Sequence, residues 1–293
     1  MIVILLQQYI FKIYMKTSIY SRNGKIMPIE TAVVSIEKIE RMYGFGVYES
    51  LKVRNNILYF VEQHVDRLMH SARCINLLHS FTAETITSWI QVFAAQIQHP
   101  STNIKVLLLG GKEADATELF LFPLAPFFPK KEWYRHGVKT FAFEYERWMP
   151  PAKSLNMLPS YYYYKQATRR GGYDALFVDR AGHIREGSRT NFYAMKGNTI
   201  VSPPKKDVLE GVTMMTIEKV LEGSQFTLEH RPISKQNLHE FDSLLLSSTS
   251  SKILPIARVD AMKFAVSPGL KRLIHIYNSA LSASQGRFEN LTP

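Results

Sequence analysis

The stretch Arg147-Trp-Met-Pro-Pro-Ala-Lys153-Ser-Leu-Asn156 lies near the middle of this 293-residue chain. A second stretch, Gly182-His-Ile-Arg-Glu186-Gly-Ser-Arg-Thr-Asn191-Phe, closes a predicted hairpin and places a carboxylate 33 residues after the lysine. A lysine amine can form an imine with an aldehyde, and a carboxylate can keep a pyridine nitrogen protonated so that the ring withdraws electrons. Lys153 and Glu186 together therefore predict a pyridoxal 5'-phosphate site.

Length and composition indicate a globular protein with a substantial core. The chain is 46% hydrophobic and 12% aromatic. Its 293 residues can form one large domain or two ordinary ones. The single cysteine, Cys74, excludes an intramolecular disulfide and a cysteine-rich metal site, and it suits a reducing cytoplasm. We therefore expect a cytoplasmic protein without a metal site.

The net charge of +11 raises the question of a nucleic-acid partner. The 36 lysines and arginines are scattered in short clusters, with no basic arm and no basic run interleaved with aromatics. A diffuse positive field that attracts small anionic molecules is the interpretation that we favour. We expect no nucleic-acid partner.

The first 14 residues are apolar but too short to span a bilayer. They lack a basic region before the apolar run and a small-residue cleavage site, which argues against a signal peptide. A second methionine follows at Met15, so residues 1–14 form either an extension upstream of the true start or a packing segment. We expect no membrane partner.

The pattern of hydrophobic residues divides the chain into two parts. Over residues 15–122, short strands and two helical stretches, Val61–Leu78 and Thr82–Gln98, predict a small α/β domain. Three prolines within Pro123–Lys131 predict an interdomain linker. Strands outnumber helices over residues 132–293, which predicts a larger, barrel-like domain with helices packed outside.

Six short elements follow one another along the chain: Tyr43-Gly-Phe-Gly-Val-Tyr-Glu-Ser50, His64-Val-Asp-Arg67-Leu, Lys153-Ser-Leu-Asn156, Glu186-Gly-Ser-Arg-Thr-Asn191, Leu209-Glu-Gly-Val-Thr213 and Ser247-Ser-Thr-Ser250. In this order they resemble the class IV (fold type IV) pyridoxal phosphate aminotransferases. That family includes branched-chain aminotransferases, D-amino acid aminotransferases and aminodeoxychorismate lyase. The resemblance covers the chain from about Ser18 to its end. It implies a two-domain α+β fold, a small α/β domain followed by a larger barrel-like domain, and a homodimer.

The resemblance also implies a role for individual residues. Lys153 would form the Schiff base and shuttle a proton, and Glu186 would hold the pyridine nitrogen. Leu209 would pack against the ring face. A helix that begins near Gly211 suits a dianion, because its first N–H groups and its dipole point toward the ligand. The residues implied around the phosphate are Arg67, Gly211, Val212, Thr213, Ser248 and Thr249.

The residues that would bind the substrate depart from the family pattern. D-amino acid aminotransferases carry an arginine for the substrate carboxylate where this chain reads Leu108-Leu-Gly-Gly-Lys112. Lys112 is the candidate replacement, and Tyr48 is a second candidate substrate contact. Met214 and Lys252 stand where many members have an arginine and a glutamate.

Three activities are compatible with this sequence. The first is a transaminase that moves an amino group between an amino acid, of branched-chain or D-amino-acid type, and a 2-oxo acid. The second is an elimination of the aminodeoxychorismate lyase type, which gives 4-aminobenzoate and pyruvate. The third is a family member that binds a ligand or a partner without catalysis, and the joint presence of Lys153, Glu186 and Arg67 argues against it. We expect the transaminase.

Overall fold

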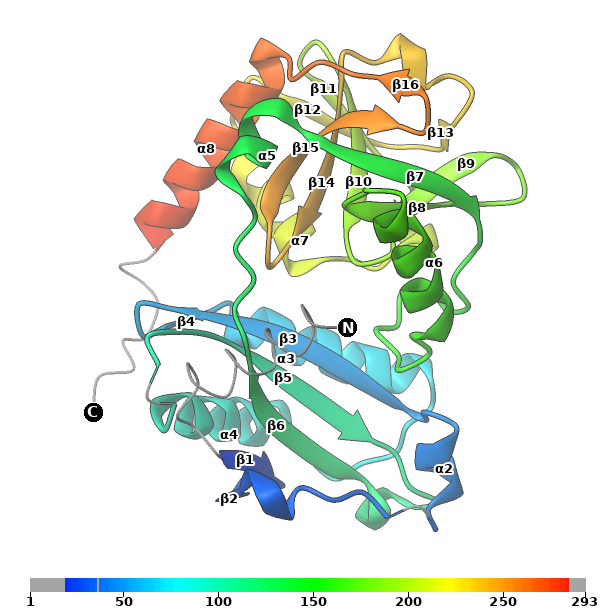
Figure 1. The fold of residues 1–293 in the computed structure, drawn as a ribbon. Coiled ribbons are helices and arrows are strands. Elements are labelled where there is room, and N and C mark those ends of the chain that lie inside the picture. The colour runs from blue at the N-terminus through cyan, green and yellow to red at the C-terminus, as the bar shows by residue number, and fades with distance from the viewer. Residues whose placement is uncertain (1–18, 36, 98, 285–293) are drawn as a thin grey trace. The chain divides into compact units, whose positions relative to one another are not determined.

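The structure is a computed structural model that describes residues 19–35, 37–97 and 99–284 (Figure 1). The segment 1–14, for which the sequence left two interpretations open, lies outside the described residues. No helix of the described part is long and apolar enough to cross a membrane.

The described chain separates into two compact units. Unit 1 contains residues 19–127 and also residues 152–156, whereas unit 2 contains residues 128–151 and 157–284. The short segment that carries Lys153 therefore belongs to unit 1, although the sequence places it within the expected second part, residues 132–293. Whether the two expected parts fold independently stays a prediction.

Unit 1 is built on a six-stranded antiparallel sheet in the order β2-β1-β6-β5-β3-β4. Its strands are β1 (Ile19–Arg22), β2 (Lys25–Pro28), β3 (Gly46–Arg54), β4 (Ile57–Tyr59), β5 (Ser101–Leu109) and β6 (Glu118–Leu124). Its helices are the short α2 (Ile39–Met42), α3 (Val61–Cys74) and α4 (Ala83–Ala95).

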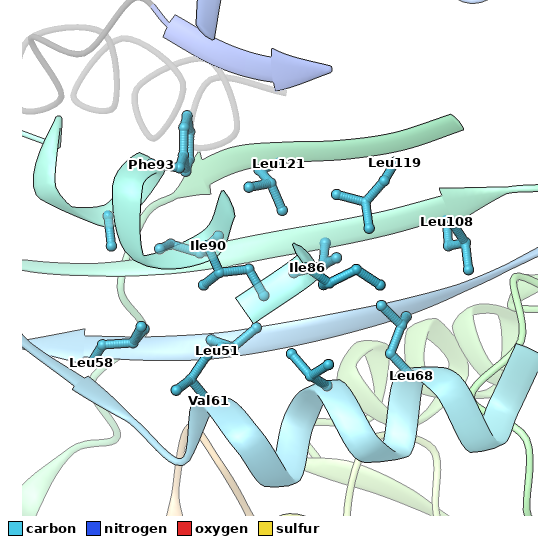
Figure 2. Close-up of a cluster of buried hydrophobic side chains, with 14 of the residues drawn as sticks. Leu51, Leu58, Val61, Leu68, Ile86, Ile90, Phe93, Leu108, Leu119 and Leu121 are labelled. Carbon is cyan, nitrogen blue, oxygen red and sulfur yellow. The ribbon is translucent and has the colours of Figure 1, made fainter. Parts of the chain in front are cut away.

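Alternation along the central strands gives the sheet of unit 1 two different faces. On β3, Leu51 and Val53 are buried while Lys52 and Arg54, which follow them, are partly exposed. The buried set packs with apolar residues of α3 and α4, such as Leu68 and Ile90 (Figure 2). The alternate residues, including Tyr48 on β3 and Lys105 on β5, lie on the other face because side chains of a strand alternate between faces.

Unit 2 contains a ten-stranded sheet and four helices among the described residues. The strands are β7 (Val138–Glu144), β8 (Asp174–Val178), β9 (His183–Gly187), β10 (Asn191–Lys196), β11 (Thr199–Ser202), β12 (Thr227–His230), β13 (Ile233–Ser234), β14 (Ser243–Ser248), β15 (Lys252–Val259) and β16 (Met262–Lys263). The helices are α5 (Lys131–His136), α6 (Leu158–Arg169), α7 (Val212–Leu221) and α8 (Pro268–Ser284).

Six strands of unit 2 close into a ring. The order β10-β14-β15-β7-β8-β9 returns to its start, because β9 pairs with β10 through Glu186 and Asn191. Apolar residues of these strands, among them Leu176, Phe192 and Leu246, form a buried core. The ring confirms the barrel-like sheet that the sequence predicts for this part of the chain.

The expected linker 123–131 begins inside a strand. β6 continues through Pro123 to Leu124, where Ile104 of β5 is the partner of Pro123 on one side. On the other side, β1 pairs with β6 only at Phe120 and Leu121. A proline is tolerated here because, among the described residues, this end of β6 pairs with one strand, β5.

Candidate active site

The backbone of Lys153 is held by a strand and by a helix of unit 1. Its N–H donates to Oγ of Ser71 on α3 (3.0 Å), and its carbonyl accepts from the N–H of Tyr48 on β3 (3.0 Å). The next residue, Ser154, forms an antiparallel bridge with Val47. The starting point of the lysine side chain is thus fixed by contacts that do not involve its amine.

The ring of Tyr48 is close to two lysine amines. Nζ of Lys153 lies 4.7 Å from the ring centroid, and Nζ of Lys105 lies 3.4 Å from it. Lys105 pairs with Ser50, two residues beyond Tyr48 on β3, so Lys105 and Tyr48 are diagonal neighbours on one face of the sheet. Burial lowers the pKa of Lys105 to about 8, although the negative charge of Glu49 opposes this shift. Sequence reasoning missed Lys105; a lone lysine inside an apolar strand was the available signal.

Arg67, the predicted phosphate ligand, is paired with a buried carboxylate of its own unit. Its Nε and Nη2 donate to Glu49 Oε1 and Oε2 at 2.6 Å and 2.8 Å. Glu49 is 1% exposed and Arg67 is 9% exposed. Since the guanidinium has five N–H donors, this bidentate pair uses two of them and sets the plane of the group.

His64 completes the charged cluster around Glu49. Its Nδ1 lies 2.8 Å from Glu49 Oε2 and donates to it, since an ionised carboxylate only accepts. Burial alone would raise the pKa of Glu49, but Arg67 and His64 hold it well below its usual range. Burial lowers the pKa of His64, whose Nε2 is enclosed and has no hydrogen-bond partner among the described residues. The cluster therefore consists of an anion, a cation and a neutral imidazole.

Glu186, the predicted partner of the pyridine nitrogen, lies where β9 and β10 close the ring of unit 2. It is 5% exposed, and each of its oxygens has a donor. Nε of Arg147 donates to Oε1 (2.6 Å), and the N–H of Leu209 donates to Oε2 (3.2 Å). Arg147 also donates to the carbonyl of Pro150. Although Arg147 opens the motif that contains Lys153, its pairing with Glu186 was not predicted.

Asn191 connects the Leu209 segment to the start of α7. Its Nδ2 donates to the carbonyl of Leu209 (2.7 Å). A Cβ added to Gly211 would lie 2.2 Å from Asn191 Oδ1, so any side chain at this position would have to displace the amide of Asn191. Gly211 precedes the first turn of α7, in which Val212 and Thr213 are buried. The hydroxyl of Thr213 shares a hydrogen bond with Tyr277, whose pKa burial raises to about 12.

The remaining predicted residues lie at a strand end and in loops. Ser248 is the last residue of β14; its Oγ lies 2.8 Å from Oγ of Ser251 and accepts the N–H of Ser251 (3.1 Å), and Thr249 and Ser251 lie in the turn that follows. Lys112 is exposed in the loop after β5. Within unit 1 the structure thus groups Lys153 with Tyr48. Within unit 2 it groups Glu186, Leu209 and Gly211 around Asn191.

Comparison with known proteins gives consistent relatives. The profile described as Amino-transferase class IV matches residues 46–259. The D-alanine aminotransferase of Bacillus licheniformis is 26% identical over 250 residues, which cover 81% of this chain and 87% of that protein. A probable branched-chain-amino-acid aminotransferase of Aquifex aeolicus is 24% identical over 299 aligned residues, which cover 92% of this chain and 95% of that protein.

Solved structures with the same fold include branched-chain amino acid aminotransferases. The T.th. enzyme with pyridoxamine 5'-phosphate matches with a TM-score of 0.86 at 19% identity, over 95% of this chain and 100% of that one. The enzyme of Thermoproteus uzoniensis with norvaline matches with a TM-score of 0.83 at 20% identity, over 94% of this chain and 99% of that one. These structures show the two-domain α+β fold. The family profile matches well over half of the residues of this chain, so the chain belongs to the amino-transferase class IV family.

Proposed function

We propose that this class IV aminotransferase binds pyridoxal 5'-phosphate through Lys153 and moves an amino group between an amino acid and a 2-oxo acid. The main observation in support is that the backbone of Lys153 and the carboxylate of Glu186 are both held in place by hydrogen bonds within the protein. The backbone of Lys153 is held by Ser71 and Tyr48, and both oxygens of Glu186 have donors. One structural relative was solved with pyridoxamine 5'-phosphate.

The residues present suit this cofactor group by group. The bound cofactor would supply a ring that withdraws electrons from the substrate Cα. Lys153 would hold the cofactor through its amine, and that amine, once released by the incoming substrate, would carry the proton of Cα. The buried carboxylate of Glu186 suits a protonated pyridine nitrogen.

The proposed phosphate ligands come from several elements. Arg67 supplies a cation, and the turn that holds Ser248 and Thr249 supplies hydroxyls. The start of α7 at Gly211, Val212 and Thr213 supplies N–H groups that are not blocked by a Cβ at residue 211. Leu209 would pack against the ring face.

The amino donor is the finer part of the proposal. The relatives are named as D-alanine and branched-chain aminotransferases, so a D-amino acid or a branched-chain amino acid is the expected donor, with Tyr48 and Lys112 as substrate contacts. We also propose a cytoplasmic homodimer that acts on small molecules.

The test of the cofactor linkage is the pair Lys153→Ala and Lys165→Ala. The wild-type protein with pyridoxal phosphate should show visible absorption that borohydride abolishes. Lys153→Ala should lose both this absorption and amine transfer, because no other amine occupies its position. Lys165→Ala, a change on α6, should keep both. A Lys153→Ala protein that still formed a reducible adduct would move the assignment to Lys165.

A donor panel separates the possible activities. The holoenzyme is mixed with L-leucine, L-glutamate, D-alanine or a simple amine, without a 2-oxo acid. A transaminase converts its cofactor to the pyridoxamine form with the correct donor, whereas a lyase leaves the cofactor unconverted. Conversion by D-alanine alone or by L-leucine alone would identify the donor class. No conversion by any donor would contradict the transaminase.

A further inference from the structure

Two lysine amines in unit 1 lie against one aromatic ring, and the proposed function uses only one of them. Lys105 is 3.4 Å and Lys153 is 4.7 Å from the centroid of Tyr48. These two distances together set an upper limit of about 8 Å on the separation of the two nitrogens. The face of an aromatic ring attracts cations, so Tyr48 holds the ammonium group of Lys105 near the amine of Lys153.

We propose that Lys105 is an electrostatic partner of Lys153: its ammonium group favours the uncharged form of the Lys153 nitrogen, both as the free amine and when it is bound to the cofactor, and thereby makes that lysine a better nucleophile and base near neutral pH. The physical cause is repulsion between like charges, which disfavours the charged form of either group. At the upper limit of about 8 Å the repulsion corresponds to a shift of about 0.4 pH units in water and about 1.5 pH units at the effective dielectric constant of a protein surface, and a shorter separation gives a larger shift. This inference rests on the proposed function, in which Lys153 binds the cofactor.

The other charged groups near this pair leave the repulsion in place. Glu49 attracts Lys105, but the positive charge of Arg67 on α3, which pairs with Glu49, offsets part of this attraction. Lys52 on β3 has its amine 5.7 Å from the ring of a different tyrosine, Tyr59.

On the β6 side, the residue opposite Lys105 is the apolar Phe122. The amine of Lys105 titrates near pH 8, as burial lowers its pKa. The repulsion should therefore act fully below pH 8 and fade above it.

The experiment titrates the visible absorption of the lysine-bound cofactor against pH in the holoenzyme, so its readout is independent of turnover. Lys105→Met should raise the midpoint by at least about 0.4 pH units, and by about 1.5 pH units or more at the effective dielectric constant of a protein surface. Lys105→Arg should keep the midpoint at or below the wild-type value, because a guanidinium stays charged throughout. The matched control is Lys52→Met, which removes a lysine from the ring of Tyr59 and should leave the midpoint unchanged.

Three outcomes would overturn the inference: an unchanged midpoint in Lys105→Met, a lowered one, or an equal rise in Lys52→Met, which would indicate a general field effect. A wild-type protein without visible absorption would instead contradict the proposed function. The proposed function is supported if the absorption titrates in the wild type and is lost in Lys153→Ala. The midpoints of the Lys105 variants then test only the role of Lys105. Should Lys105→Met not fold, Lys105→Gln supplies the same loss of charge.

Discussion

Two buried carboxylates, Glu186 in unit 2 and Glu49 in unit 1, each accept hydrogen bonds from side chains or backbone outside their own strand. Glu186 on β9 is bound by Arg147 and by the N–H of Leu209. Glu49 on β3 is bound by Arg67 and His64 from α3. A buried charge without partners is strongly destabilising, so the donors are as necessary as the carboxylates themselves. At the residue scale, each buried carboxylate and its donor therefore have to be considered as a pair.

Arg147→Met should lower the free energy of unfolding by about 3 kcal/mol, because it leaves Glu186 buried without its charged partner. The double variant Arg147→Met with Glu186→Gln should recover part of this loss. The matched control is Arg231→Met, since Arg231 pairs with Glu229 on the surface (51% and 50% exposed) and such pairs contribute less than about 1 kcal/mol. Urea unfolding measures all three. Equal losses for Arg147→Met and Arg231→Met would show that Glu186 does not depend on Arg147.

At the scale of elements, the N-termini of two helices, α7 and α4, differ in how their first N–H groups are covered. The start of α7 contains Gly211, where a side chain would meet Asn191. The start of α4 is capped by Thr82, whose hydroxyl accepts the N–H of Thr85 (3.2 Å). The same kind of element thus begins with a bare backbone in one unit and with a side-chain cap in the other. Only the bare end leaves its N–H groups open to an anion.

Gly211→Ala should weaken the binding of pyridoxal phosphate and lower the free energy of unfolding by about 1–3 kcal/mol, the usual result of overpacking. The added methyl group displaces Asn191, which holds the carbonyl of Leu209. Asn191→Ala breaks the same link, so the double variant should cost less than the sum of the two single variants. Cofactor titration and urea unfolding measure the effects. Fully additive losses would contradict a shared mechanism.

Thr82→Ala should lower the free energy of unfolding by about 1 kcal/mol, because α4 loses its side-chain cap. Thr82→Ser keeps the hydroxyl and should remain within a few tenths of a kcal/mol of the wild type. Thermal unfolding of both variants is the measurement. A similar loss in Thr82→Ser would mean that the methyl group of Thr82, and not the cap, provides the stability.

At the scale of the whole molecule, stability should fall on acidification in two steps. Burial lowers the pKa of His64 from 6.5, so the unfolded chain binds a proton that the folded protein excludes once the pH falls below 6.5. Burial of Glu49 is outweighed by Arg67 and His64, which lower its pKa from 4.5, so a second loss follows below pH 4.5. Each group contributes at most about 1.4 kcal/mol per pH unit.

The test compares urea unfolding at pH 7.5 and pH 5 for three proteins. His64→Gln keeps a donor for Glu49 but cannot titrate, so its stability should fall less than that of the wild type over this range. His239→Gln changes an exposed histidine of unit 2 and should behave as the wild type. An identical fall in His64→Gln and in the wild type would exclude His64 as the cause.

Local sequence was sufficient for most elements and for the identity of the reactive groups. The alternation of Val47–Val53 predicted β3, and the spacing of apolar residues predicted α3 and α4 to within a few residues. These features depend on side-chain periodicity, which is a property of neighbouring residues. Lys153 and Glu186 were singled out because amine and carboxylate chemistry can be recognised without knowing the fold.

The tertiary structure decided which groups meet. Lys105 and Tyr48 are 57 residues apart, and only the register of β3 against β5 places them on one face. Glu49 and Arg67 meet because α3 packs on the face of the sheet that carries Glu49. Likewise, Arg147 reaches Glu186 only through the folding of unit 2. Sequence by itself determined the chemistry of the reactive residues, whereas their charged neighbours were set by long-range strand pairing and packing, which no local pattern encodes.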